Sequence, residues 1–514
     1  MLENAMNLPW ICVFINCVVL SGGRKNVLFL IADDMRAELS SYNGRDFPSS
    51  IHPPMFTPNL DALAAKSLLL KRAYVQQALC SPSRTSVLTG RRPDTTHVYD
   101  LHTYFREVGG NFTTIPEYFK MNGYETVGIG KVFHAGRASG NDDPVSWSQP
   151  YFHGVDNWED GHVSWKAVPD HFLKNKPLVD KQIADHAIAT LRNLAPAAKS
   201  GRKPFFIGVG FQRPHLPFVF PQSFMHHYPK SKIHLPKSQH APNNMPPVAW
   251  SSYQELRNYQ DILVLGVNGD INSTLPGNKV LELRRAYYSA ISWVDSLVGT
   301  VLSELSNLGL ANNTIVSFFG DHGYQLGEHG EWCKHTNFEL ATHAPMMVHI
   351  PGKTDKGIVT EKLVEFVDLF PTLVEAADFK PLPLCPEDST KVLLCREGMS
   401  LIPLITNPNG AFKNASFSQY ARPRKYYDVM GYTIRTNRYR YTEWVKFIRK
   451  PIYKPDWSVS FGVELYDHQT DPNETINKAY HSHSQQLLGR LSNQLRAGWR
   501  HALKASSITD IFGR

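Results

Sequence analysis

Short apolar runs that end in polar residues alternate along this chain with segments of helical periodicity. The apolar runs cover residues 26–32, 126–129, 204–211, 314–319 and 344–350, and the helical patterns cover 57–67, 115–122, 180–194, 283–308 and 368–377. This alternation is typical of a mostly parallel sheet with helices on both faces. With 42% hydrophobic and 19% charged residues among 514, the composition supports such a core and excludes disordered and collagen-like chains.

Four of these runs are followed by ionisable side chains. In chain order these are Asp33 and Asp34, Lys131 and His134, His215, and Asp321 and His322. In open α/β sheets, ligands bind outside the carboxyl ends of the strands. A single Asp after a strand is often only a helix cap, but four strand ends that converge in this way predict an active site at one sheet edge.

The composition changes after about residue 407. From Ser416 onward the chain is rich in Tyr and Arg, with β-like runs at 432–444 and 463–466 and a helical pattern at 484–503. We therefore expect a large α/β domain over 24–407 and a smaller C-terminal α+β domain over 408–514.

The N-terminal apolar run, residues 9–20, is too short to span a bilayer and fits the hydrophobic region of a signal peptide. No Lys or Arg precedes it, and a buried N-terminal strand is the alternative. We expect a signal peptide over 1–23, entry into the secretory pathway and no transmembrane segment. The Asn-x-Ser/Thr sequons agree with this expectation as glycosylation sites, and they lie at Asn111, Asn272, Asn312, Asn414 and Asn473.

The six cysteines are too few for a disulfide scaffold. Cys12 and Cys17 would leave with the signal peptide. Cys385 and Cys395 lie in a Pro-rich, loop-like stretch, and we expect them to form a disulfide. The net charge of +8 is spread along the chain, so it indicates no nucleic-acid partner.

The most specific stretch is Cys80-Ser81-Pro82-Ser83-Arg84, which continues to Leu-Thr-Gly-Arg at 88–91. Pro82 suits the first turn of a helix and Gly90 its end, so Cys80 is expected at a helix N-terminus, where free N–H groups favour an anion. A lone cysteine would be interpreted as a buried thiol. The whole string, however, resembles the signature of the sulfatase family. Residues 123–134 (GYETVGIGKVFH) resemble the second motif of that family. Further similar pieces lie at 78–100, 109–120, 213–218, 321–334, 385–398 and 430–444.

The resemblance implies an alkaline-phosphatase-like fold for the large domain and hydrolysis of sulfate esters. It also implies that a formylglycine-generating enzyme oxidises Cys80 to Cα-formylglycine during biosynthesis. The hydrated aldehyde would attack sulfur, form a sulfo-enzyme intermediate and then expel sulfate. Phosphatases and phosphodiesterases of the same fold use Ser or Thr as nucleophile, so Cys80 argues against them.

The resemblance further implies one Ca²⁺, with Mg²⁺ as a possible substitute, because an oxygen-rich ligand set suits these ions better than Zn²⁺. The implied metal ligands are Asp33, Asp34, Cys80, Asp321 and His322. The implied catalytic residues are Cys80, Arg84, Lys131, His134, His215 and Lys334. Among them, His134 would take the proton of the hydrated aldehyde, and His215 would donate a proton to the leaving oxygen.

The resemblance is closest to family members that remove the 2-sulfate of terminal L-iduronate in heparan sulfate and dermatan sulfate, in the lysosome or outside the cell. The expected substrate contacts are Arg36, Tyr99, Asp100, Tyr324, Trp332 and His335. Tyr324 stands in place of Trp and His335 in place of Tyr, which predicts a retuned pocket. The alternatives are an exo-sulfatase for another sulfated sugar and a non-catalytic glycan-binding protein.

Overall fold

The computed structural model describes residues 24–42, 52–159, 161–423 and 428–508, so the expected signal peptide lies outside the described residues. Its main sheet has seven strands in the order β11-β2-β10-β7-β1-β5-β3. Their bounds are β1 Asn26–Ala32, β2 Leu68–Tyr74, β3 Glu125–Gly130, β5 Phe205–Phe211, β7 Thr314–Gly320, β10 Met346–His349 and β11 Ile358–Glu365. β1 pairs in parallel with β5 and β7, whereas β10 is antiparallel to both of its neighbours. The predicted mostly parallel sheet is confirmed.

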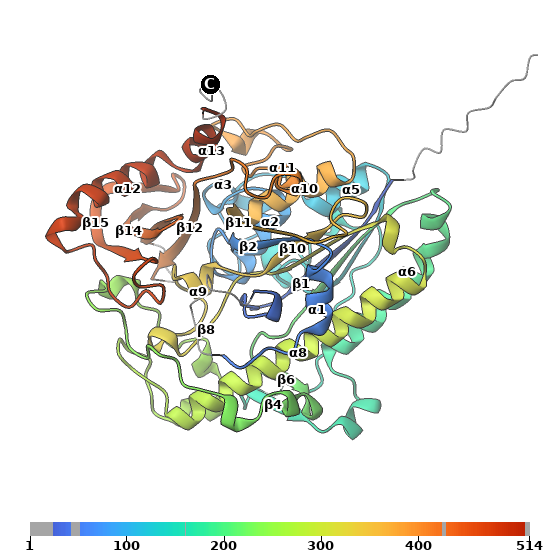
Figure 1. The fold of residues 1–514 in the computed structure, drawn as a ribbon, viewed down its shortest axis with the longest axis horizontal. Helices are drawn as coiled ribbons and strands as arrows, with labels where there is room; N and C mark the ends of the chain where they lie inside the picture. Colours follow the sequence, from blue (N-terminus) through green and yellow to red (C-terminus); the bar gives the residue numbers. More distant parts are fainter. Residues whose placement is uncertain (1–23, 43–51, 160, 424–427, 509–514) are drawn as a thin grey trace, which may run out of the picture.

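Helices cover both faces of this sheet (Figure 1). Leu28 and Leu30 of β1 belong to one core, with α1 Pro58–Ala64, α6 Val179–Lys199 and α8 Gly277–Asn307. Val27 and Phe29 point to the opposite core, with α2 Cys80–Thr89, α5 Ile115–Met121 and α10 Leu369–Ala376. Because successive side chains of a strand face opposite sides, a wholly apolar β1 indicates a sheet buried on both faces.

The connections contain short elements. These are β4 Trp165–Val168, β6 Phe218–Pro221, β8 Gln325–Leu326, β9 Trp332–Cys333, α3 Pro93–Thr96, α4 Phe105–Val108, α7 Gln260–Leu263, α9 Glu339–Thr342 and α11 Ile402–Thr406. No helix among the described residues combines the length and the apolar character that a membrane span requires.

The C-terminal part forms a second, antiparallel sheet in the order β12-β13-β14-β15. Its strands are β12 Ala415–Arg422, β13 Val429–Thr436, β14 Tyr439–Ile448 and β15 Lys454–Asp467, followed by α12 Gln485–Ala497 and α13 Trp499–Ile508. The prediction of one helix over 484–503 was wrong, because Gly498 has φ +77° and separates two helices. Glycine adopts this left-handed conformation without steric cost.

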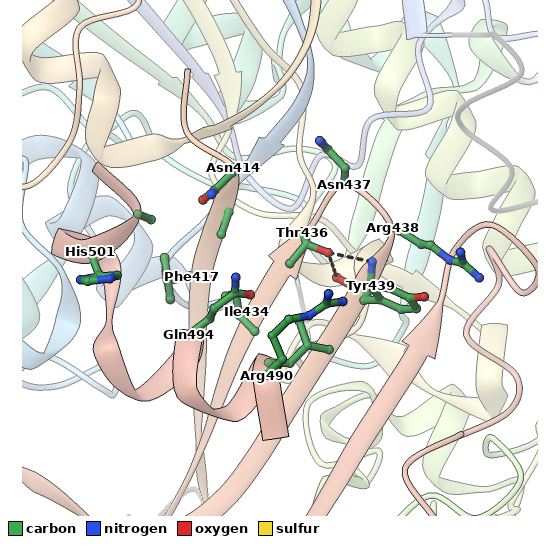
Figure 2. Close-up of a pocket in the computed structure, with 13 residues that line it drawn as sticks. Asn414, Phe417, Ile434, Thr436, Asn437, Arg438, Tyr439, Arg490, Gln494 and His501 are labelled. Carbon is green, nitrogen blue, oxygen red and sulfur yellow. Dashed lines mark hydrogen bonds between the residues drawn. The ribbon is translucent and has the colours of Figure 1, made fainter. Parts of the chain in front are cut away.

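A groove of about 570 Å³ opens on this second sheet, between the β13–β14 turn and the two C-terminal helices (Figure 2). Asn437, Tyr439, Arg490 and Gln494 are among the residues that line it. None of the expected catalytic or metal-binding residues lines this groove, although the sequon residue Asn414 does. This groove is therefore separate from the strand ends that carry the expected chemistry.

The predicted disulfide between Cys385 and Cys395 is present and spans a sequence separation of 10. Closing a loop of this length removes unfolded-state entropy worth about 3 kcal/mol. We expect the double variant Cys385→Ala/Cys395→Ala to lose stability of that order while kcat stays unchanged, since this loop contacts Arg91 just past the end of α2 that is opposite to Cys80. Thermal unfolding with and without reductant measures the loss. A melting temperature equal to that of the unmodified protein would contradict it.

Candidate active site

Neighbouring strands bring four of the expected metal ligands to one sheet edge. Ala32 at the end of β1 pairs with Gly320 at the end of β7, so the residues that follow leave the sheet side by side. The Asp34 amide donates to Oδ1 of Asp321 at 2.9 Å. Asp34 has φ +61°, in a region that Asp tolerates better than most residues, and this turn directs its carboxylate toward the next strand end.

Helix α2 brings Cys80 to the same place. It begins at Cys80 and ends before Gly90, whose φ is +65°, as the sequence predicts. Cys80 Sγ lies 3.4 Å from Nε2 of His322 and 3.9 Å from Oδ1 of Asp34. Burial is the main cause that raises the pKa of the Cys80 thiol well above its usual value. The unmodified side chain is thus a neutral thiol, and a poor nucleophile.

The donor set fits a divalent cation. Ligand atoms of Asp33, Cys80, Asp321 and His322 all lie within 4.8 Å of one another, and so do those of Asp33, Asp34, Cys80 and His215. The three Asp side chains are at most 1% exposed. Burial raises the pKa of Asp34 well above its usual value, and the charge of Lys334 only partly opposes this effect. Buried carboxylates gathered in this way favour a hard cation such as Ca²⁺ or Mg²⁺.

The cationic side chains expected at the site form ion pairs with these carboxylates. Arg84 donates from Nε to Asp321 at 2.9 Å and from Nη2 to Asp33 at 3.0 Å. Lys131 pairs with the other oxygen of Asp33. Lys334 Nζ lies 3.0 and 2.9 Å from the two oxygens of Asp34. Three cationic side chains therefore surround the sulfur of Cys80, and an anionic ester would find all three within one cluster.

Burial lowers the pKa of both expected proton-transfer histidines, and the pKa of His215 lies well below its usual value. His215 follows β5, is 27% exposed at its side chain, and places Nε2 3.9 Å from Asp34. Its Nδ1 contacts the carbonyl oxygen of Leu216, which fixes the ring. His134 places Nδ1 3.3 Å from the carbonyl of Ala135, and burial followed by the charge of Lys131 lowers its pKa to about 3. His134 is therefore neutral at ordinary pH, and the neutral ring is the form that can accept a proton.

Most of the side chains that we expect to contact the substrate contact other parts of the chain instead. Arg36 is fully buried and pairs with Glu38 at 2.7 Å and Glu328 at 3.3 Å. Tyr324 is 0% exposed, and its ring stacks on Tyr287 with centroids 5.3 Å apart. The structure therefore places Arg36 and Tyr324 in the interior beneath the strand ends.

Three more of the expected contacts have structural partners. The Tyr99 hydroxyl donates to Asp94 at 3.1 Å, and Asp100 accepts the amide of Thr103 at 2.7 Å. Trp332 is 2% exposed within the core beside α8. His335, the sixth expected contact, lies beside the catalytic cluster.

His335 joins that cluster through Glu255, a residue that the sequence analysis missed. Glu255 Oε2 lies 2.5 Å from Nε2 of His335, and Oε1 lies 2.7 Å from Nζ of Lys334. Glu255 stands in an irregular stretch before the short 3-10 helix Leu256–Asn258, outside every matched motif. No sequence signal distinguishes it from a surface glutamate.

The C-terminal sheet also reaches the site. Tyr420 of β12 places its hydroxyl 2.8 Å from Nδ1 of His335. Arg422 at the end of β12 donates to the backbone carbonyls of His335 at 2.6 Å and Trp250 at 3.2 Å. The second sheet therefore fixes His335 and the segment that leads to Glu255.

The five sequons differ slightly in exposure. Asn473 is partly buried, and the other four are exposed at Asn111, Asn272, Asn312 and Asn414. An oligosaccharide on any of the four exposed residues would meet no core packing.

Comparison with known proteins gives two family models and a set of relatives. The model described as Sulfatase matches residues 25–379, and the model of the N-sulphoglucosamine sulphohydrolase C-terminal region matches 327–500. Iduronate 2-sulfatase of Mus musculus is 38% identical, covering 88% of this chain and 90% of its own length. The Homo sapiens protein of the same name is 37% identical with the same coverage.

Solved structures agree on the fold. A phosphonate monoester hydrolase of Agrobacterium radiobacter superposes with a TM-score of 0.68 at 20% identity, covering 93% of this chain and 96% of its own. A 2-O GAG sulfatase superposes with a TM-score of 0.64 at 20% identity, covering 92% and 91%. Because these two neighbours cleave different esters, the fold by itself does not select the substrate.

Proposed function

Since this chain belongs to the sulfatase family and is a sulfuric ester hydrolase, we propose that its substrate is the 2-sulfate of terminal L-iduronate in heparan sulfate and dermatan sulfate. The observation that carries the enzymatic part is the position of Cys80 Sγ, 3.4 Å from His322 Nε2 at the N-terminus of α2. The names of the two iduronate 2-sulfatases that resemble it along most of the chain support the substrate.

We propose that Cys80 is converted to Cα-formylglycine by a formylglycine-generating enzyme, and that Asp33, Asp34, Asp321 and His322 hold one Ca²⁺, or Mg²⁺ in its place. The modified side chain would supply, once hydrated, an oxygen nucleophile that the thiol lacks. The metal would supply positive charge next to the sulfate oxygens. The cluster of buried carboxylates around Cys80 supports both assignments.

The remaining roles belong to the side chains of this chain. Arg84 and Lys131, each paired with Asp33, would orient the nucleophile and one side of the sulfate. Lys334 would bind the sulfate, and His215 would donate a proton to the leaving sugar oxygen. His134, neutral because of its lowered pKa, would take the proton of the nucleophile.

An exo-sulfatase for a different sulfated sugar is the second candidate. Tyr324 and His335 replace the Trp and the Tyr expected of the iduronate enzymes. The interior position of Tyr324 and the contact of His335 with Glu255 therefore favour this candidate. A non-catalytic glycan-binding protein would not require the complete set of cations and carboxylates around Cys80.

We further propose a lysosomal or extracellular location, with a signal peptide over 1–23, a catalytic domain over 24–407, a C-terminal domain over 408–514, and glycans on the sequon residues. The disulfide between Cys385 and Cys395 supports folding in an oxidising compartment.

We expect the purified enzyme to release sulfate from a disaccharide with terminal 2-sulfated iduronate at a kcat/KM at least about 100-fold above that for the 6-sulfated glucosamine counterpart, a discrimination reached when a site bonds specific substrate groups. Disaccharides matched in length and differing in sulfate position and uronate type provide the comparison. Equal rates for all of them, or a preference for another sugar, would move the assignment to the second candidate.

A further inference from the structure

Glu255 contacts three candidate site residues at once. Its Oε1 lies 2.7 Å from Nζ of Lys334 and 3.4 Å from Nε2 of His215, and its Oε2 lies 2.5 Å from Nε2 of His335. The side chain of Glu255 is 16% exposed, so its carboxylate is mostly enclosed but still reaches solvent. It thus connects two residues expected at the sulfate with one expected at the sugar.

The backbone on both sides of Glu255 is anchored. Leu256 is fully buried in the core beside α8. Tyr253 donates its hydroxyl to the carbonyl of Ser273 at 2.7 Å, and its own carbonyl accepts the amide of Arg257 at 2.8 Å. The amide of Ser251 donates to Glu331 at 2.9 Å. A side chain carried by such a segment has a defined direction, as a positioning group requires.

We propose that Glu255 is a positioning residue of this enzyme, which holds Lys334 and His215 in their sulfate-binding directions and ties His335 of the sugar pocket to them. The assignment of His215 and Lys334 to the sulfate, on which this inference rests, belongs to the proposed function. Sulfate transfer and sugar recognition would therefore both depend on the carboxylate of Glu255.

Two physical considerations support a positioning role. A lysine ammonium sits on a flexible four-carbon stem, so a single partner leaves it several orientations. Asp34 is also an expected metal ligand, and Glu255 is the second carboxylate that fixes Lys334. The negative charge of Glu255 weakens the binding of an anionic substrate. This loss of affinity is offset if the orientation that Glu255 imposes on Lys334 and His215 speeds the reaction.

The test uses the full-length enzyme and two substrates, a 2-sulfated iduronate disaccharide and a small aryl sulfate without a sugar. Glu255→Gln keeps the size of the side chain and removes its charge. Glu255→Asp keeps the charge and shortens the reach. The matched control is Glu443→Gln, since Glu443 is a buried glutamate of β14 that accepts from Tyr441 and Arg496 in the C-terminal part.

We expect Glu255→Gln to lower kcat about 100-fold on both substrates and to raise KM on the disaccharide alone, since an aryl sulfate does not use His335. Glu255→Asp should recover part of the lost kcat. The control should keep kcat within about threefold. Melting temperatures of all variants report any general loss of stability.

Three results would overturn the inference. The first is a kcat of Glu255→Gln within about threefold of wild type on both substrates. The second is an equal loss of kcat in Glu255→Gln and Glu443→Gln. The third is a kcat of Glu255→Asp as low as that of Glu255→Gln on both substrates. A wild-type enzyme that cleaves the aryl sulfate but spares the disaccharide would overturn the proposed substrate instead. The aryl sulfate comparison would then still decide the role of Glu255.

Discussion

Replacing Cys80 by alanine is expected to abolish sulfate release while the fold remains intact. Alanine carries neither the thiol nor the formylglycine that we propose is made from it, so the variant has no group to attack sulfur. Loss of a catalytic nucleophile lowers kcat by at least about 10⁴-fold in comparable hydrolases. The structural effect is small, because Sγ makes contacts of 3.4 and 3.9 Å only and alanine is the best helix former at the start of α2.

Sulfate release and thermal unfolding of the variant and the wild type test this expectation together. Cys333→Ala is the matched control, since Cys333 is the other free cysteine that is buried among the described residues and no role in transfer is assigned to it. Mass spectrometry of the wild-type peptide that contains Cys80 should show an aldehyde in place of the thiol. Full turnover by Cys80→Ala, or an unmodified thiol in active enzyme, would rule out the formylglycine mechanism.

The part of this site that the sequence predicts is the part that depends on strand ends and motifs. Asp33, Asp34, Asp321 and His322 were expected together because each follows an apolar run, and the β1–β7 register places them side by side. Cys80 was expected at a helix N-terminus from Pro82 and Gly90, and α2 begins there. These predictions need local patterns and one rule about sheets, and no knowledge of distant contacts.

What the sequence could not predict depends on contacts between distant segments. The sequence does not predict strands β2 and β11, because their burial is mixed. In β2, Leu68–Tyr74, Lys71 and Arg72 interrupt the apolar pattern. Glu255 lies in a loop and Arg422 lies at the end of β12, and the two residues come together at His335 only after folding.

The expected substrate contact Arg36 fits the same explanation. Its partners Glu38 and Glu328 are two and 292 residues away, so the sequence does not show that its guanidinium is already neutralised in the interior. Motif resemblance therefore predicts which residues gather at the strand ends, whereas it does not show which neighbouring side chains are already paired within the protein.

Removal of divalent metal is expected to abolish activity and to lower the melting temperature together. Asp33, Asp34 and Asp321 are buried close together, and Arg84, Lys131 and Lys334 form ion pairs with them. A bound cation would offset their mutual repulsion. It would stabilise the folded state by about 2.7 kcal/mol at a free concentration 100 times its dissociation constant.

The unfolding measurement is made on chelator-treated protein titrated with Ca²⁺, Mg²⁺ or Zn²⁺. Because unfolding is followed separately from sulfate release, the metal site is tested without relying on turnover. Asp321→Asn should lose the stabilisation by Ca²⁺, since an amide is a weaker ligand for a hard cation than a carboxylate. Asp467→Asn is the matched control, because Asp467 pairs with Arg438 in the second sheet, and this variant should keep the full stabilisation. If Ca²⁺ raises the melting temperature of Asp321→Asn as much as that of the wild type, the cation binds elsewhere and the three carboxylates balance only the cationic side chains around Cys80.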